Sequence, residues 1–197
     1  MGRTLAAAGL LVLAAAAAGD PYESAKRKIS LIEQDLAPPG ARIWLSLKEL
    51  NAYGAREALA QAPQGLREPR LELGNGSATG YAMVDFAKVW ASQSASPNRL
   101  VSWFLSGERP VRVAVRIQSS GGEATVFLDA VTVSGIEARG ALLDFLVKNF
   151  LLPRYPQAKI GEPFRLKHRI ERFEVTSAGV TVFIFAPPRA DGLSPSR

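Results

Sequence analysis

Cysteine is absent from the 197-residue sequence, and histidine occurs only once, as His168. The lack of cysteine excludes disulfides, thiol nucleophiles, thiolate zinc sites and iron–sulfur clusters. A single histidine excludes a multi-histidine metal site within one chain, and a Ser-His-Asp triad would have to use His168. We interpret His168, which lies between Lys167 and Arg169, as a half-buried strand residue. The composition therefore predicts a protein that is not an enzyme and holds no metal or other cofactor.

The sequence also lacks a strong excess of charge of one sign. Its 24 Lys and Arg residues exceed its 18 Asp and Glu residues by six. Nucleic-acid binding requires clustered positive charge, so we expect no nucleic-acid partner. Apolar residues make up 47% of the chain, which is enough for a folded core and excludes general disorder. The oligomeric state stays open.

The uninterrupted apolar run at the start of the chain is short. It covers residues 5–18 after Arg3, whereas a membrane-spanning helix needs about 20 apolar residues. Small residues at 16–19 precede the polar Asp20. This pattern predicts a signal peptide at residues 1–19 and an exported, periplasmic or secreted protein. An uncleaved N-terminal membrane anchor is the alternative. We assign residues 20–186 to a single α+β domain and residues 187–197, rich in Pro, Ser and Gly, to a flexible tail.

Local signals predict two helices and a hairpin in the first half of the domain. A helix is expected over 22–36. Ser46 and Glu49 form a capping-box pattern that starts a second helix over 47–60. Asn75-Gly76 predicts a hairpin turn. The glycines around it do not make a dinucleotide-binding loop, because a strand follows where a helix is required.

Period-two alternation predicts further strands. Residues 78, 80, 82, 84 and 86 share one strand face, and strands 111–117 and 124–133 meet at Gly121-Gly122. Adjacent apolar residues within 124–133 indicate either burial of both faces or a β-bulge. We also expect a helix over 96–105 and strands over 164–170 and 180–184.

The helix predicted over 141–152 is apolar almost all round. Its polar side chains are Asp144, Lys148 and Asn149, which leaves an apolar arc far wider than a surface helix needs. Either the sheet encloses this helix or the helix faces a lipid.

The second half of the chain reads as strand, glycine, amphipathic helix and hairpin, over segments 130–136, 142–146, 160–166, 169–175 and 180–182. With these segments, and more loosely with Leu47 to Asn51, the chain resembles the LmeA-like, tubular lipid-binding type of exported bacterial domain. This resemblance implies an α+β fold, a half-barrel in which a long curved antiparallel sheet wraps around one or two helices and holds lipid chains in an apolar groove.

We therefore expect a non-enzymatic envelope protein that binds a lipid or other apolar molecule between sheet and helix. The alternative is a structural or assembly protein of the envelope that binds a protein partner and has no ligand. The predicted groove residues are Trp90, Trp103, Phe104, Leu146 and Phe150.

Three basic residues alternate along the predicted strand 164–170, namely Arg165, Lys167 and Arg169. We favour a solvated outer strand face for them. The functional interpretation is contact with lipid head groups or an anionic membrane surface.

Export has a direct test. Protein recovered from the periplasm or medium should have the mass of the chain without residues 1–19, because signal peptidase removes the segment during translocation. Protein carrying Met1 in that fraction would instead identify the segment as an anchor.

Overall fold

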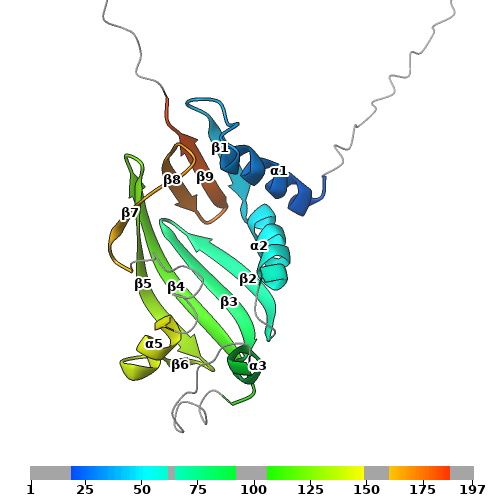
Figure 1. The fold of residues 1–197 in the computed structure, drawn as a ribbon, viewed down its shortest axis with the longest axis vertical. Coiled ribbons are helices and arrows are strands. Elements are labelled where there is room, and N and C mark those ends of the chain that lie inside the picture. Colours follow the sequence, from blue (N-terminus) through cyan, green and yellow to red (C-terminus); the bar gives the residue numbers. More distant parts are fainter. Residues whose placement is uncertain (1–18, 62–64, 92–105, 149–159, 187–197) are drawn as a thin grey trace, which may run out of the picture.

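The computed structural model describes residues 19–61, 65–91, 106–148 and 160–186. Within these ranges the protein is α+β, with two antiparallel sheets and few helices (Figure 1). None of the helices in these ranges is long and apolar enough to cross a membrane. The coarse fold class expected from the sequence is therefore confirmed.

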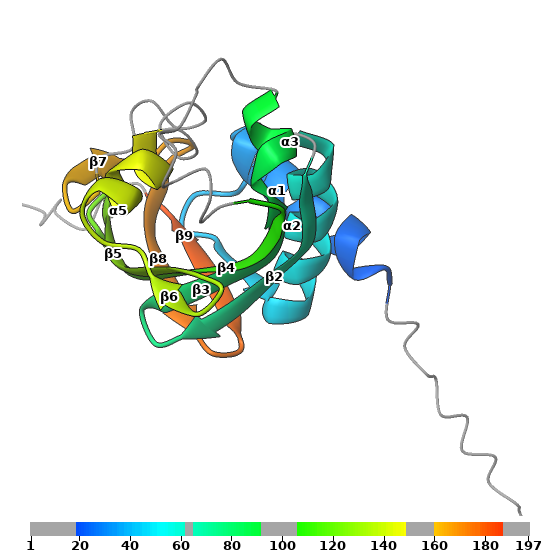
Figure 2. The ribbon, with the colours of Figure 1, turned by 90° about the horizontal axis from the view of Figure 1, so that it is seen from below.

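The larger sheet is open and curved. Its strands are ordered β2-β3-β4-β5-β6, and β7 pairs with the start of β5, at the opposite end from β6. Seen from below, β2 to β5 form an arc, with the short helices α3 (Phe86–Ala91) and α5 (Ala141–Leu146) on its concave side (Figure 2). The strands are β2 (Leu66–Gly74), β3 (Ser77–Asp85), β4 (Glu108–Ser120), β5 (Glu123–Val133), β6 (Ile136–Glu137) and β7 (Pro163–Arg165).

The smaller sheet has the order β1-β9-β8 and packs against two helices. These elements are β1 (Arg42–Ser46), β8 (Ile170–Thr176), β9 (Gly179–Ile184), α1 (Pro21–Glu33) and α2 (Leu47–Gln61). One core cluster lies here and includes Ala25, Ile32 and Ile184. A second cluster, which includes Phe86, Val133 and Leu146, lies against the larger sheet. Most of the buried apolar side chains of the described residues thus belong to one of two separate clusters.

The predicted hairpins and the bulge are present. Asn75 and Gly76 form the β2–β3 turn, and Gly121-Gly122 connect β4 to β5. Ala114 pairs with Ala130, but Val115 pairs with Leu128, so Asp129 is the extra residue of a bulge. The bulge brings apolar residues on both sides of it to the same sheet face, which resolves the two interpretations left open by the sequence.

The outer edge of β8 is covered by the turns of the larger sheet. The Gly76 amide donates to the Val175 carbonyl at 3.0 Å, and the Gly122 amide donates to the Glu171 carbonyl at 2.7 Å. Between them, the Ser119 hydroxyl accepts from the Phe173 amide at 2.7 Å and donates to its carbonyl. These bonds join the two sheets and leave less of the β8 edge unpaired.

The continuous strand predicted over 164–170 is wrong. β7 ends at Arg165, and β8 starts only at Ile170. His168 and Arg169 have φ angles of 58° and 53°, so they form a turn instead of a strand. The Arg169 guanidinium donates to the carbonyls of Asp35 and Ala37, and these long-range bonds stabilise the turn.

The α2 side chains Glu49 and Asn51 organise the region around α1, β1 and β2. The predicted capping box forms, since the Glu49 amide donates to Ser46 Oγ and the Ser46 amide donates to Glu49 Oε2 at 2.7 Å. The Asn51 side chain accepts from the Leu71 amide at 2.7 Å and donates to its carbonyl at 2.9 Å. Asn51 therefore pairs with the edge of β2 as a neighbouring strand would.

Glu49 is a buried carboxylate, 8% exposed. Its Oε1 accepts from Ser24 Oγ and Lys28 Nζ, both at 2.6 Å. Burial alone would raise its pKa, but the hydrogen bonds from Lys28, Ser24 and Ser46 outweigh burial and lower the pKa from 4.5 to about 2. The ionised form therefore ties α1 and β1 to the start of α2.

This lowered pKa predicts a pH-dependent stability. A depressed carboxyl pKa contributes stability above pH 4.5, which is lost as the pH falls toward 2, and the shift corresponds to about 3 kcal/mol. Glu49→Gln should lower the free energy of unfolding at neutral pH, and its difference from the wild type should shrink toward pH 2. Urea denaturation at several pH values measures this. Glu33→Gln, at an exposed position of α1, is the control and should follow the wild type. If the free energies of unfolding of the wild type and Glu49→Gln differed by the same amount at every pH, the lowered pKa of Glu49 would be contradicted.

Candidate functional site: an apolar cavity on the concave face

The concave face of the larger sheet borders a cavity of about 450 Å³. Strands β2 to β5 supply most of its described wall, and α3, α5, Val147 after α5 and Ile160 before β7 supply the remainder. The described lining residues are Leu66, Gly80, Tyr81, Ala82, Val84, Phe86, Val111, Val113, Val115, Val126, Leu128, Val131, Leu146, Val147 and Ile160.

Strand alternation explains why this wall is apolar. Gly80, Ala82 and Val84 alternate along β3 and lie beside Val113, Val111 and Arg109 of β4 in the strand register. Side chains two apart on a strand share a face, so the inner positions, apart from Arg109 near the start of β4, form one surface of short or branched apolar groups. The short side chains at 80 and 82 leave space beside the wall. A Cβ built on Gly80 would meet no heavy atom within 4 Å outside its chain neighbours.

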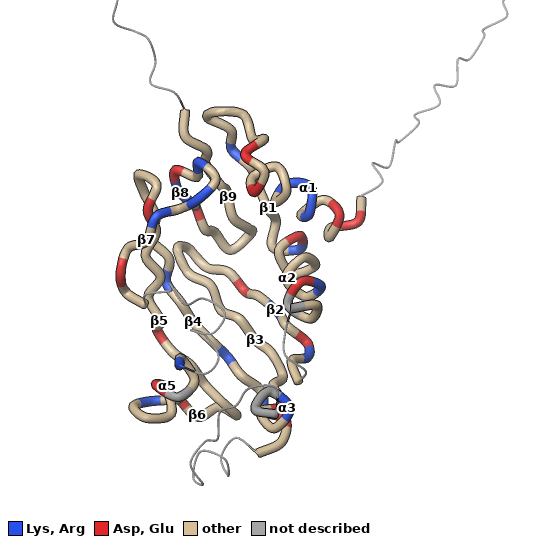
Figure 3. The backbone as a smooth tube through the Cα atoms, in the orientation of Figure 1, with Lys and Arg blue, Asp and Glu red and all other residues tan. Residues whose placement is uncertain are grey.

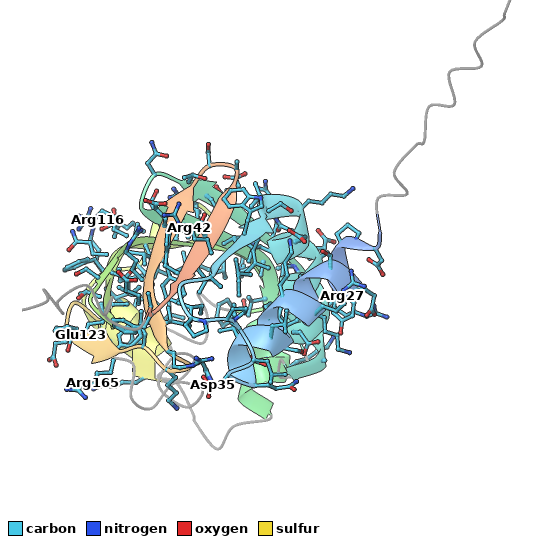
Figure 4. All side chains as sticks on the ribbon, turned by 90° about the horizontal axis from the view of Figure 1, so that it is seen from above. Arg27, Asp35, Arg42, Arg116, Glu123 and Arg165 are labelled. Atoms are coloured by element: carbon cyan, nitrogen blue, oxygen red, sulfur yellow. The ribbon has the colours of Figure 1, made fainter. Side chains whose placement is uncertain are left out.

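Arg70, Glu72, Arg116 and Asp129 of the same strands lie on the convex face. The Arg116 guanidinium contacts the Asp129 carboxylate at 2.8 Å, and Figure 4 shows Arg116 pointing away from the sheet. Arg70 stacks on the Tyr81 ring, whose hydroxyl donates to Glu72 Oε2 at 2.8 Å. The polar atom of the Tyr81 side chain is therefore satisfied outside the cavity.

The described lining offers no group for acid–base or metal chemistry. It contains no ionisable side chain other than Tyr81. Within the described ranges, no cluster of three or more His, Asp or Glu residues could hold a metal ion. A polar ligand group would lose its water contacts here without gaining hydrogen bonds, which costs several kcal/mol. The arrangement can bind apolar groups.

Of the five predicted groove residues, the structure describes the side chain of Leu146 only. Leu146 of α5 is 8% exposed, lines the cavity and belongs to the core cluster of the larger sheet. Trp90 lies in α3, but its side chain is outside what the structure describes. Trp103, Phe104 and Phe150 lie outside the described residues. The described part of the predicted helix 141–152 is α5 followed by a wider π turn at residues 147–148.

The sequence interpretation missed the strand residues that make most of the wall. The shared face of 80, 82, 84 and 86 was visible, but such a pattern is equally typical of a filled core. The small residues at 80 and 82 were the available signal.

The three basic residues predicted to contact head groups do not form one strand face. Arg165 is exposed on β7 and points outward in Figure 4, and Lys167 is exposed in the following turn. The Arg169 guanidinium donates hydrogen bonds to the carbonyls of Asp35 and Ala37, between α1 and β1. Figure 3 shows positive charge gathered along the β7–β8 connection. Contact with an anionic surface stays a prediction for this segment.

His168 has a carboxylate near it. Its Nδ1 lies 3.8 Å from Asp35 Oδ2, which is longer than a hydrogen bond, and Asp35 also lies near the Arg169 guanidinium. The Asp35 side chain is 54% exposed. Neither residue is among the described lining of the cavity. This pair does not build a catalytic site with the apolar wall.

Comparison with known proteins adds no family. The chain matches no protein-family model, and the comparisons found no curated protein and no solved structure that matches it.

The packing of Leu146 predicts a measurable stability effect. Leu146→Ala should lower the free energy of unfolding by about 2–3 kcal/mol, near the low end for buried leucines because the side chain already borders open space. Leu59→Ala is the matched control, since Leu59 is 50% exposed on α2 and should change stability by less than about 0.5 kcal/mol. Urea denaturation of both variants measures the difference. Equal losses would show that α5 does not pack on the sheet as described.

Proposed function

We propose that the protein binds a lipid or another apolar molecule in the cavity on the concave face, without catalysing a reaction. The observation that carries this proposal is a cavity of about 450 Å³ whose described lining has no charged side chain. This volume lies within the range of about 300–1,000 Å³ typical of small-molecule pockets. A core that only supports the fold would be filled to close packing.

The driving force for binding is the transfer of apolar surface out of water. Each buried methylene contributes about 0.8 kcal/mol, so about ten methylenes would contribute on the order of 8 kcal/mol. Restricting the chain opposes part of this gain. The described part of the wall supplies no charged partner, so the apolar part of the ligand occupies the cavity and any polar head group lies outside it.

The resemblance to tubular lipid-binding domains fits this proposal. We propose that the curved sheet is the half-barrel of such a domain and that α5 is its covering helix. Export to the envelope, inferred from residues 1–19, would place the cavity where membrane lipids are available. The exposed Arg165 and Lys167 are the candidate contacts for an anionic membrane surface.

A matched pair of variants tests the proposal. Native mass spectrometry of protein purified from its own cells should show a bound apolar molecule. Ala82→Phe adds a ring on the inner face and should remove most of this bound mass. Ala114→Phe adds the same ring on the outer face of β4, between the inner-facing Val113 and Val115, and should retain it. Thermal unfolding of both variants checks that they fold.

A wild type that binds no apolar molecule would contradict the proposal. If the folded wild type carries no apolar molecule and takes up a fluorescent fatty acid no better than Ala82→Phe does, the cavity is not a ligand site. The envelope assembly protein that binds a protein partner would then be the better interpretation.

A further inference from the structure

We propose that the outer face of the smaller sheet holds a binding site for one oxyanion, the phosphate or carboxylate group of a soluble molecule. The side chains of Arg42 and Arg172 supply the hydrogen-bond donors, and the ring of Phe183 is the floor of the site. The site is separate from the cavity and does not depend on the proposed function.

The strand register brings these three side chains together. Phe183 of β9 pairs with Arg42 of β1 on one side and with Arg172 of β8 on the other. Side chains of directly paired residues lie on the same face of a sheet. The neighbouring residues Val182 and Ile184 belong to the core cluster that α1 covers. Because side chains alternate along a strand, the two arginines and Phe183 lie on the opposite, outer face.

This outer face is open to solvent in the part of the chain that the structure describes. Arg42 is exposed, and the Arg172 side chain is 33% exposed. Trp44, two residues after Arg42 on the same face, is 41% exposed. Figure 4 shows Arg42 beside β9, away from Arg27 of α1. A soluble ion can therefore reach both guanidinium groups.

Both guanidinium groups lie against one ring. The guanidinium carbon of Arg172 is 3.5 Å from the centre of the Phe183 ring, and that of Arg42 is 5.4 Å from it. These two distances to one point place the guanidinium carbons at most about 9 Å apart. Like charges this close repel each other, and an anion that accepts hydrogen bonds from both offsets the repulsion. The planar fork of a guanidinium matches the oxygens of a carboxylate or phosphate.

Two similar stacks on the convex face of the larger sheet differ from this one in charge. In each of them one guanidinium stacks on one aromatic ring and also contacts one carboxylate, so the stack is neutral. Their members are Arg70, Tyr81 and Glu72 in one stack, and Arg116, Phe127 and Asp129 in the other.

The stack on Phe183 carries an excess positive charge. Glu174 Oε1 lies 3.4 Å from Arg172 Nη1, which is longer than a charge-assisted hydrogen bond, and the Glu174 side chain is 59% exposed. An exposed ion pair of this kind is weak. No carboxylate of the described residues forms a salt bridge with Arg42. Two guanidinium groups thus share one ring and one distant carboxylate, and one bound oxyanion would give this stack the neutral composition of the other two.

Calorimetric titration with inorganic phosphate at low ionic strength tests the site. The wild type should bind one phosphate per chain in the millimolar range, and binding should weaken as salt is added. Arg42→Gln removes one charged donor and should weaken binding about tenfold. Glu174→Gln removes the carboxylate that competes for Arg172 and should strengthen binding about threefold.

Arg116→Gln is the matched control. It changes the net charge as Arg42→Gln does, and its guanidinium also stacks on a ring, but that guanidinium already contacts the Asp129 carboxylate. This variant should bind phosphate as the wild type does. Equal losses in Arg116→Gln and Arg42→Gln would indicate attraction to the net charge of the protein and would overturn the site.

The remaining outcomes also decide the inference. A wild type that binds no phosphate overturns it and leaves the proposed function of the cavity unaffected. Binding to phosphatidylglycerol vesicles without binding of soluble phosphate overturns the soluble ligand in favour of a membrane surface. Thermal unfolding checks that the variants fold. If Arg42→Gln does not fold, Glu174→Gln at its exposed position decides the matter, and an unchanged affinity there overturns the site.

Discussion

The backbone hydrogen bonds between β8 and the turns of the larger sheet hold the two halves of the molecule together. An unpaired edge strand exposes a row of donors and acceptors, and β8 would be such a strand. The amides of Gly76 and Gly122 reach its carbonyls because both residues adopt positive φ angles, 66° and 84°. The positive φ at Gly122 favours glycine, and a Cβ there would also lie 3.1 Å from the Phe185 ring, which would have to shift slightly.

The cavity lies on the concave face of the larger sheet, away from the core cluster of the smaller sheet. The helices α1 and α2 cover the smaller sheet, and their core cluster does not extend along the concave face of β3 and β4. The 13 residues of β4 span about 43 Å, whereas the six residues of α5 span about 9 Å, so α5 covers a small part of that face. The curvature of the sheet and the short side chains at 80 and 82 leave the remaining space in the described part of the molecule.

Local signals in the sequence predicted local structure well. The Ser46–Glu49 capping box, the Asn75-Gly76 turn and the alternation of β4 and β5 depend on residues a few positions apart, and all three are present. Features that depend on distant partners were missed. The turn at His168 and Arg169 is stabilised by carbonyls more than 130 positions away, and Asn51 reaches β2 twenty positions further along. No window of the sequence contains both partners of such bonds.

Residue types and their spacing are enough to establish the strand alternation, the apolar character of one face and the lack of cysteine and of a second histidine in this chain. That this face borders a cavity instead of a filled core follows only from how the elements pack. Whether space remains depends on the curvature of the sheet and on the distance to the covering helix. A cavity and a filled core can share the same pattern of small and branched residues on β3. The two differ only in whether a neighbouring element fills the space beside the strand when the elements pack.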